Sequence, residues 1–507
     1  MTQNKKTALN STRNSDYTQW YLDVISAADL AEHSSTRGAM ILKPWGYALW
    51  ERCQKILDEA FKKTGHQNVY FPLLIPLKMF AKEAQHIDGF AKECAVVTHH
   101  RLSKNADGQL VPDGELEEPY VIRPTSEMII GEAFSRWVDS YRDLPILINQ
   151  WANVMRWEMR TRLFLRTSEI LWQEGHTAHA TAKEAREETL LMLSVYENFI
   201  EKTLNIPVIT GMKPMIERFP GAEETYTLEV MTQNQKALQA GTSHFMGQNF
   251  AKACDIQFTS AAGQKEFAWT TSWGMTTRLI GALIMVHADD CGLVLPAPLA
   301  PYHVVILPIL KNRDSDAIVL KKAQEIQEEI ESLFFEKEPI RVHIDRRDIR
   351  GGDKNWQWIK KGVPLRIEIG EKEIEMGTCS LSIRYKDRDP LTRMSYSLSD
   401  FYANIQSILA DQTRHMWDMA ANYRQKALYD VQSYDELKKA IQQQNDSEEK
   451  APGFFSCFLA DTPELEAHLK ALNVTARCLP MNALAEKGVC IITGQPDSPK
   501  MILAKAY

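Results

Sequence analysis

The sequence predicts an α+β protein with a large N-terminal domain, a smaller α/β domain and a small α+β domain at the C-terminus. Three observations lead to this prediction. Residues 17–300 mix helical and strand patterns and contain many aromatic residues. After the proline-rich segment 293–301, strand patterns alternate with helical ones, as in a partly parallel sheet layered with helices. Residues 451–507 form a further short segment of mixed character.

The composition is that of an ordinary soluble protein. Hydrophobic residues make up 44% and charged residues 25% of the 507 residues, and the most apolar stretch, Leu279–Val286, is far too short to cross a bilayer. Eight scattered cysteines without a CxxC pair indicate a reducing cytoplasm. Residues 1–16 are mostly polar, and we expect a flexible tail, with a transit peptide as the alternative. The net charge of −7 leaves nucleic acid possible, since phosphate contacts need only a local basic stripe.

Two helices of the first domain are indicated by periodicity and caps. Apolar side chains recur at helical spacing between Tyr47 and Phe61, which predicts an amphipathic helix that ends near Gly65. Thr181 followed by Glu184 has the form of a capping box and opens a second helix. The apolar stripe of that second helix consists of Leu190, Leu193, Tyr196 and Ile200.

The second domain is predicted over residues 301–405. Its elements alternate in the order strand 303–310, helix 315–335, strand 340–344, helix 354–361 and strand 364–370. Residues 406–507 then comprise a polar helical linker and the C-terminal domain, which ends at Tyr507.

One candidate for nucleotide chemistry lies between Trp151 and His176. On an extended strand, Arg156 and Glu158 would point to one face, where a guanidinium can hold a phosphate and a carboxylate can accept from an exocyclic amine. Further arginines, Arg166 among them, lie close to aromatic residues, which suits an anionic nucleotide with an aromatic base. Taken alone, an R-x-E pattern is more often a surface ion pair.

Three further segments contain side chains suited to a charged substrate. Gly274 leads into an apolar helix with Arg278 in its first turns, where free N–H groups favour an anion. The alternative is a buried helix with one snorkelling arginine. Thr125 and Glu127 are suited to a substrate ammonium or, alternatively, to a helix N-cap. A glycine-containing turn without metal-ligand spacing holds Gln239, Thr242, Ser243 and His244.

Together these segments resemble the three signature motifs of class II aminoacyl-tRNA synthetases, in the family's order and separation. Motif 1 corresponds to Gly65, Val69, Pro72, Leu73 and Leu74, motif 2 to the Arg156–Glu158 segment and motif 3 to the Gly274–Arg278 segment. The strings WYLDVI, RGAMILKPWGYALWE, NVYFPLLIP, RPTSE, FLRTSEILWQEGH, QAGTSH and TSWGMTTR are similar to those of prolyl-tRNA synthetases of the archaeal/eukaryotic type. The similarity runs from about Tyr17 to Tyr507, whose counterpart in that type reaches back towards the active site.

The resemblance implies both a fold and an activity. The fold would be α+β: a class II catalytic domain with an antiparallel sheet over residues 17–300, an α/β anticodon-binding domain over 301–405, and a small C-terminal domain. The activity would be the activation of L-proline with ATP and Mg²⁺ and its transfer to tRNA(Pro). The protein would be a cytoplasmic homodimer that does not associate with a membrane.

Carried over position by position, the resemblance also assigns site residues. The proline-binding set is Thr125, Glu127, Arg156, Trp172, His176, Phe219, His244, Ser272 and Gly274. The ATP-binding set is Arg156, Glu158, Arg166, Thr167, Gln239, Thr242, Thr276 and Arg278. Arg156 and Arg278 would be catalytic, since they would stabilise charge that grows on the α-phosphate. The candidate anticodon contacts are Arg366, Glu368, Lys386 and Arg388.

The sequence departs from the family in its C-terminal tail. Many relatives bind zinc there through four cysteines, whereas Ala460, Leu465 and Thr493 replace three of them and leave Cys490. Because a structural zinc site needs about four nitrogen or sulfur ligands, we expect no zinc and no other protein-bound metal there. Residues 181–265 leave no room for the large editing insertion of the other type, so some misactivation of alanine is expected.

Two other functions are weighed against this one. A non-catalytic paralogue would have no physical need to keep Glu127, Arg156, Glu158 and Arg278 together. A synthetase for threonine or serine shares the motifs, but a threonine enzyme would place a zinc ligand set in the pocket, and the sequence shows no Cys/His cluster there.

Overall fold

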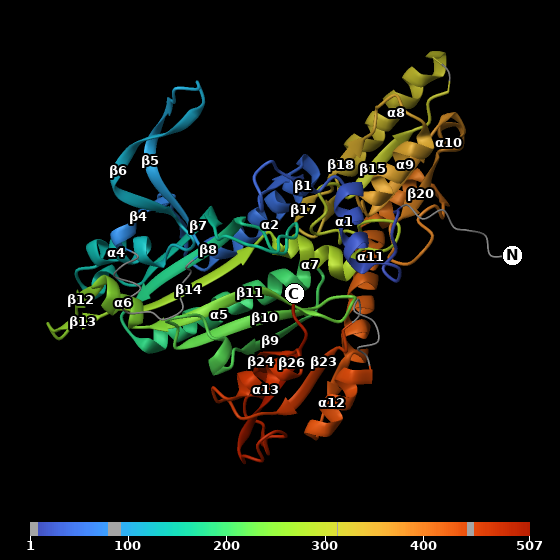
Figure 1. Ribbon diagram of the computed structural model, residues 1–507. Helices are drawn as coiled ribbons and strands as arrows, with labels where there is room; N and C mark the ends of the chain where they lie inside the picture. Colours follow the sequence, from blue (N-terminus) through green and yellow to red (C-terminus); the bar gives the residue numbers. More distant parts are fainter. Residues whose placement is uncertain (1–8, 80–92, 312, 444–450) are drawn as a thin grey trace.

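The computed structural model describes residues 9–79, 93–311, 313–443 and 451–507. Figure 1 shows a broad central sheet, an α/β unit above it that follows residue 300, and the C-terminal strands and helices below it. No helix within these described ranges is both long and apolar enough to cross a membrane.

The chain is anchored well before its first helix. Leu9 is buried in the main core, and Arg13 forms ion pairs of 3.2 and 2.5 Å with two aspartates of later segments. The expectation of a flexible tail over residues 1–16 is therefore wrong for residues 9–16, because these contacts hold them in place. Residues 1–8 lie outside the described part of the chain.

Two N-terminal helices pack onto the central sheet. Helix α1 (Tyr17–Ala27) begins after Asp16, whose carboxylate accepts from a backbone N–H of the first turn at 2.8 Å. Helix α2 (Pro44–Lys63) has proline at its first position, and the chain leaves it through Gly65 at φ 92°. The predicted helix that ends near Gly65 is confirmed, except that Tyr47 is 42% exposed and lies off the buried stripe.

The central sheet has twelve strands and an antiparallel centre. That centre runs β9 (Val208–Met212), β10 (Glu224–Met231), β11 (Ala237–Gly247), β14 (Trp269–Thr276), β8 (Glu169–His179) and β7 (Ile146–Met155). The short strand β3 (Gln67–Asn68) pairs in parallel with β7 at the edge. The predicted α+β class with an antiparallel sheet is confirmed.

Helix α5 (Ala182–Lys202) covers one face of this sheet. It begins with the predicted capping box, in which Thr181 Oγ1 accepts from the backbone N of Glu184 at 3.2 Å and the Glu184 carboxylate accepts from the backbone N of Thr181 at 3.1 Å. Trp273 of β14 packs edge-on against an aromatic ring of this helix. Leu190, expected on the buried stripe, is 38% exposed. The other face of the sheet remains available for a cavity.

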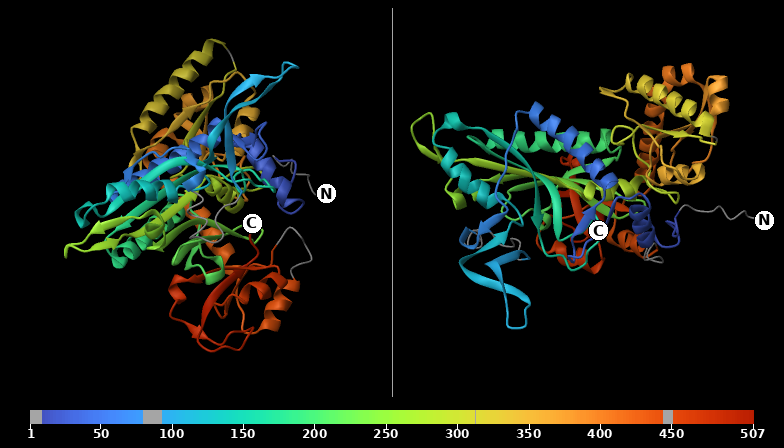
Figure 2. Two further views of the ribbon diagram at one scale, coloured as in Figure 1. Left: turned by 60° about the vertical axis from the view of Figure 1, so that its left-hand side comes forward. Right: turned by 90° about the horizontal axis from the view of Figure 1, so that it is seen from above.

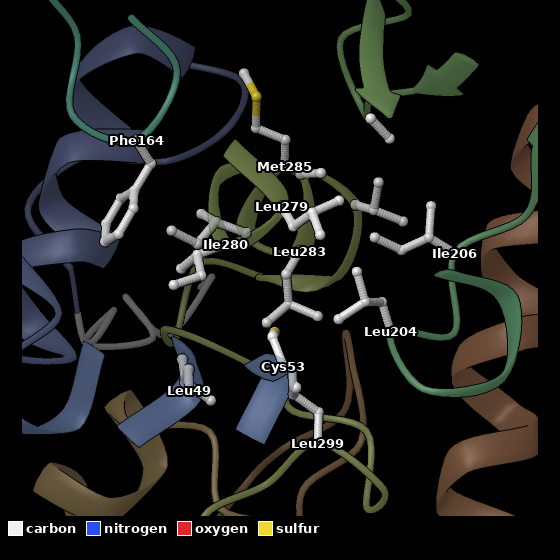
Figure 3. Packing of buried hydrophobic residues seen from close by; sticks show 14 of the residues in the cluster. Leu49, Cys53, Phe164, Leu204, Ile206, Leu279, Ile280, Leu283, Met285 and Leu299 are labelled. Atoms are coloured by element: carbon white, nitrogen blue, oxygen red, sulfur yellow. The ribbon is translucent and has the colours of Figure 1, made fainter. Parts of the chain in front are cut away.

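The most deeply buried helix is α7 (Arg278–His287), in which every residue after the first is buried. Figure 3 shows Leu279 and Leu283 of this helix in one cluster with Leu49 and Cys53 of α2. This packing holds the first turn of α7 in a defined position relative to the sheet.

The C-terminal residues extend the same sheet. Strand β24 (Thr475–Pro480) pairs with β9, and β26 (Ser498–Ala504), β23 (Phe454–Phe458), β22 (Leu428–Asp430) and β25 (Lys487–Gly488) complete this part, with helices α12 (Tyr434–Gln443) and α13 (Leu465–Ala471). A Cβ at Gly211 would lie 2.5 Å from Cys478 Cβ, so this glycine permits the close approach of β24. The C-terminal domain is thus joined directly to the central sheet.

The second domain has a five-stranded, partly parallel sheet, as predicted. Strands β18 (Val342–Ile344), β15 (Val304–Pro308) and β19 (Leu365–Ile369) are parallel, and β20 (Thr378–Ile383) and β21 (Met394–Ser397) follow in antiparallel order. The helices are α8 (Arg313–Glu331), α9 (Gly351–Lys360) and α10 (Glu371–Met376).

Helix α11 (Leu398–Lys426) crosses the predicted boundary between residues 405 and 406. Its side chains Phe401 and Ile405 belong to the core of the second domain, whereas Ala420 packs in the core of the first. The boundary therefore divides one continuous helix, because that helix serves two cores.

The remaining elements are small. A hairpin of β5 (Ala95–Lys104) and β6 (Leu110–Ile122) pairs with β4 (Leu74–Pro76) and projects from the body in Figure 2. The others are β1 (Ala31–His33), β2 (Met40–Leu42), α4 (Glu127–Trp137), η1 (Tyr141–Asp143), η2 (Met215–Glu217), α6 (Asn249–Cys254), β12 (Gln257–Thr259), β13 (Lys265–Phe267), β16 (Phe334–Phe335), β17 (Glu338–Pro339) and η3 (Met481–Ala483).

Candidate active site

A cavity of about 600 Å³ opens on the face of the central sheet opposite α5. Every residue predicted to bind proline lines it: Thr125, Glu127, Arg156, Trp172, His176, Phe219, His244, Ser272 and Gly274. So does every residue predicted to bind ATP, which adds Glu158, Arg166, Thr167, Gln239, Thr242, Thr276 and Arg278. The structure brings both sets together, and the role of each residue stays a prediction.

The register of the antiparallel strands explains this grouping. His244 of β11 lies opposite Ser272 of β14, which in turn lies opposite His176 of β8. Alternate residues of a strand face the same side, so the row two positions along points into the same cavity. This next row consists of Thr242, Gly274 and Glu174.

Two glycines shape the strands below the cavity. A Cβ at Gly175 would lie 2.0 Å from the Trp273 ring, so this glycine admits the tryptophan on the side away from the cavity. A Cβ at Gly274 would meet only the carbonyl oxygen of Gln173, at 3.2 Å. The missing side chain at Gly274 therefore widens the cavity and not the core.

Thr125 and Glu127 form a polar pair at the cavity wall. The Thr125 hydroxyl donates to the Glu127 carboxylate. The N-cap residue of α4 is Ser126, and its hydroxyl donates to Glu174 at 2.6 Å instead of capping the helix. The alternative interpretation of this segment as an N-cap is therefore wrong for the side chains.

Glu174 is a buried residue of the site that sequence reasoning missed. Its carboxylate accepts from Ser126 at 2.6 Å and Gln150 at 2.5 Å and lies 3.1 Å from His176 Nε2. Burial by itself would raise the pKa of Glu174, but His176 and the two donors outweigh it and lower that pKa, while Glu174 raises the pKa of His176 against burial. The alternation of Trp172, Glu174 and His176 along one strand was the signal that could have found it.

Arg156 lies one residue beyond the end of β7. The expectation that Arg156 and Glu158 share one extended strand is therefore wrong, because the chain turns into a loop after Met155. Arg156 Nε donates to the Pro124 carbonyl at 2.8 Å, and the guanidinium carbon lies 5.5 Å from the centroid of the Trp172 ring. Burial lowers the pKa of Arg156, with nearby glutamates opposing this.

Arg278 begins helix α7 at the side of the cavity where the residues predicted to bind ATP lie. Its backbone N donates to Thr276 Oγ1 at 3.0 Å, and its Nε donates to the Leu165 carbonyl at 3.3 Å. Burial lowers the pKa of Arg278, and the neighbouring cations Arg166 and Arg156 lower it further. Partly buried positive charge at a helix N-terminus is suited to a polyanion.

The opposite wall is less polar. The rings of Phe219 and His244 are 4.6 Å apart, and His244 Nδ1 lies 3.1 Å from the Thr225 hydroxyl. Burial, with a contribution from His176, lowers the pKa of His244 to about 3, so the imidazole is neutral at physiological pH. A small apolar ring fits between such walls.

Tyr507 lies at the cavity, as the resemblance implied. Its backbone N donates to the Ala237 carbonyl at 3.1 Å, and its ring lies 5.8 Å from the Arg162 guanidinium and 5.1 Å from the Lys236 ammonium. The last residue of the chain is thus fixed against the catalytic sheet.

The structure of the second domain corrects the prediction of anticodon contacts. Arg366 is 1% exposed and donates to Asn355 at 2.8 Å and to the Pro390 carbonyl at 2.6 Å. Glu368 accepts from Asn355 at 3.0 Å and pairs with Arg393 at 2.7 Å. Helix α9 and the segment before β21 cover the strand face that was expected to be open, so Arg366 has no free edge for a base.

Lys386 is buried as well. Its Nζ donates at 2.6 Å to the carbonyl of Val286, in the last turn of α7. Burial lowers its pKa to about 8. Of the four candidate anticodon contacts, only Arg388 is exposed, with its guanidinium 4.4 Å from the Tyr385 ring centroid.

Carboxylates in the cavity wall are the candidate ligands for a metal ion. Within the described ranges, no three His, Cys, Asp or Glu side chains are grouped so as to hold a metal ion. Magnesium is often held by one or two carboxylates together with substrate phosphates, and the carboxylates of Glu158 and Glu217 line the cavity. This donor set fits a nucleotide-bound magnesium ion. The absence of zinc stays a prediction.

Comparisons with known proteins agree with this geometry. Residues 111–287 match the class II core domain of tRNA synthetases for G, H, P, S and T, and residues 303–407 match an anticodon-binding domain. Proline–tRNA ligases of Bdellovibrio bacteriovorus and Protochlamydia amoebophila are each 52% identical over 99% of both chains. That of Rhodopirellula baltica is 52% identical over 100% of this chain and 99% of its own. The chain belongs to the proline–tRNA ligase family of class II aminoacyl-tRNA synthetases.

Proposed function

We infer that the chain activates L-proline with ATP to prolyl-adenylate and transfers the prolyl group to the 3′ end of tRNA(Pro), for translation. The observation that carries this inference is the joint presence, in one cavity, of an ammonium-binding pair, an apolar wall and partly buried arginines. Family membership supports the same activity.

Proline would bind with its ring between Trp172, Phe219 and His244. Thr125 and Glu127 would accept hydrogen bonds from the ring ammonium, which carries two N–H groups. Because the pocket wall is small and largely apolar, its size selects against larger amino acids. It discriminates poorly against a smaller one such as alanine, since apolar pockets lose only about 1–3 kcal/mol per missing methylene.

Activation is an in-line displacement at phosphorus. A carboxylate oxygen of proline attacks the α-phosphorus, the bond between the α-phosphorus and the bridging oxygen breaks, and pyrophosphate leaves with the electron pair. Arg156 would contact both the proline carboxylate and the α-phosphate, and Arg278 would hold the far phosphates. The reaction needs positioning and charge stabilisation and no covalent protein nucleophile.

The adenine base and the magnesium ion complete the proposed site. Glu158 and Arg166, in the loop between β7 and β8, would hold the base, and Thr167, Gln239, Thr242 and Thr276 the rest of the nucleotide. Glu217 would bind Mg²⁺ together with phosphate oxygens. The bound ion would neutralise phosphate charge.

Transfer of the prolyl group to tRNA is also a displacement, this time at carbon. A hydroxyl of the terminal tRNA ribose attacks the prolyl carbonyl carbon, the bond to the adenylate oxygen breaks, and AMP leaves. Arg388 stands as the one exposed candidate for contact with the anticodon.

A homodimer would form through motif 1, at the edge of the central sheet. Strand β3 is the edge strand, and large apolar side chains beside it are exposed: Tyr70 by 75%, Trp137 by 48% and Leu74 by 41%. A second copy that covered them would remove this apolar surface from water. The size of the complex in solution, measured by sedimentation, tests this point.

We also propose the archaeal/eukaryotic type without an editing insertion, working in the cytoplasm. Residues 180–268 support this, since α5, α6 and strands β9 to β13 occupy this segment between the loop of motif 2 and strand β14. An editing activity of the protein itself would contradict this proposal. Robust hydrolysis of alanyl-tRNA by the pure protein is the outcome that would do so.

The test of the proposed function is ATP–pyrophosphate exchange with each of the twenty amino acids. Exchange with proline that is lost in Arg156→Ala is expected. Exchange with threonine or serine instead would favour another synthetase of this class. A folded wild-type protein that exchanges with none of them would favour a non-catalytic paralogue.

A further inference from the structure

A buried triad of charges connects the C-terminal domain to the cavity. Glu229 of β10 pairs with Lys213, which follows β9, at 3.0 Å, and with Arg477 of β24 at 2.8 and 3.0 Å. The exposed side-chain fractions are 0%, 3% and 8%, respectively. Arg477 reaches this position because β24 of the C-terminal domain pairs directly with β9.

The triad contains one more positive charge than negative. Arg477 alone, bound to Glu229 through two nitrogens, would already balance the carboxylate. Lys213 adds a second buried cation, and burying an unbalanced charge is costly unless an anion comes to it. Glu217, the other carboxylate that acts on Arg477, is partly exposed and therefore screened by solvent.

Lys213 also faces the cavity. It lines the cavity wall, and the structure gives its Nζ one hydrogen bond, to Glu229, whereas an ammonium has three donors. Glu229 lies opposite Gln239 in the strand register, and its charge acts on Arg278. The ammonium is therefore directed to the ATP side of the cavity.

We propose that Lys213 binds the phosphates of ATP that leave as pyrophosphate, and that Arg477 of the C-terminal domain is a positioning residue for it through Glu229. This rests on the proposed activation reaction. In that reaction, the bond from the α-phosphorus to the bridging oxygen breaks, and the negative charge that develops on the leaving pyrophosphate is met by the Lys213 ammonium. Arg477 of the C-terminal domain thus serves the activation step through Glu229 and Lys213, without itself contacting the substrate.

The first test measures ATP–pyrophosphate exchange with proline for Lys213→Met and for Lys213→Gln, which keeps a donor for Glu229. KM for ATP should rise roughly 10- to 100-fold, the loss typical of a charge-assisted hydrogen bond, with KM for proline nearly unchanged. Arg477→Met should raise KM for ATP by a smaller factor, and Arg477→Lys should restore most of it. Lys500→Met is the control, since it removes a C-terminal ion-paired cation away from the cavity.

The second test uses inorganic pyrophosphate with magnesium and follows the melting temperature. Pyrophosphate should stabilise wild-type protein and Lys500→Met, and much less so Lys213→Met. If the wild-type protein shows this stabilisation but no exchange, the proposed activity fails while the role of Lys213 in binding stands. Unchanged KM for ATP and unchanged pyrophosphate stabilisation in folded Lys213 variants would overturn the proposal.

Discussion

Arg384→Met should loosen the junction between the second domain and the central sheet. Arg384 of the segment after β20 is fully buried and donates to Asp289 at 2.6 and 2.8 Å and to the Gly292 carbonyl at 3.2 Å. Burial by itself would raise the pKa of Asp289, but Arg384 outweighs it and holds that pKa below its ordinary value. Removing one partner of a buried ion pair costs about 3–5 kcal/mol, because the other charge is left buried.

The companion change separates charge from packing. In Asp289→Asn/Arg384→Met neither charge of the pair is left. The backbone N–H groups of Cys291 and Asp387 donate to different oxygens of Asp289, so the single amide oxygen of Asn can still accept from one of them. The double variant should therefore lose about 1–2 kcal/mol, less than the single variant. The stabilisation from Asp289 is present above its unfolded pKa, about 3.9, and is lost as the pH falls through the lower folded pKa.

Urea unfolding, followed by tryptophan fluorescence, measures these differences in the free energy of unfolding from the first unfolding transition. Asp289 lies two residues after the end of α7, and α7 carries Arg278, so Arg384→Met should also lower the rate of ATP–pyrophosphate exchange. A loss below about 1 kcal/mol in Arg384→Met, or a double variant less stable than the single one, would refute this account of the junction.

Three further predictions concern the site and the second domain. Gly175→Ala should leave little folded protein in expression and melting assays, because its Cβ would lie 2.0 Å from the Trp273 ring. A substitution to Ala at an exposed position should leave the amount of folded protein unchanged. Glu174→Gln should weaken the dependence of the melting temperature on pH above about pH 6.5. In the wild-type protein, Glu174 raises the pKa of His176, and the stability this gives is lost as the pH rises through that pKa. An unchanged pH profile of the melting temperature would contradict this. Arg366→Met should lower stability by about 2–4 kcal/mol without changing the salt dependence of tRNA binding, measured by filter binding.

The sequence predicted which residues would lie together at one cavity, through their resemblance to the class II motifs, while their roles stay predictions. The segments around His176, Gly274 and His244 belong to strands that are antiparallel neighbours in register. Local patterns also specified the capping box at Thr181 and the helix that ends at Gly65, because caps and positive φ depend on residues close in sequence.

Contacts between distant segments could be decided only by tertiary structure. The alternation at Arg366 predicts an outward side chain, but whether that side faces water depends on helix α9 and the segment that packs over it. Likewise, nothing near Arg477 in the sequence indicates that β24 pairs with β9 and delivers a guanidinium to Glu229. Periodicity predicts to which face of a strand or helix a side chain points. Whether that side chain is buried or paired with a charge depends on which other part of the chain packs against that face.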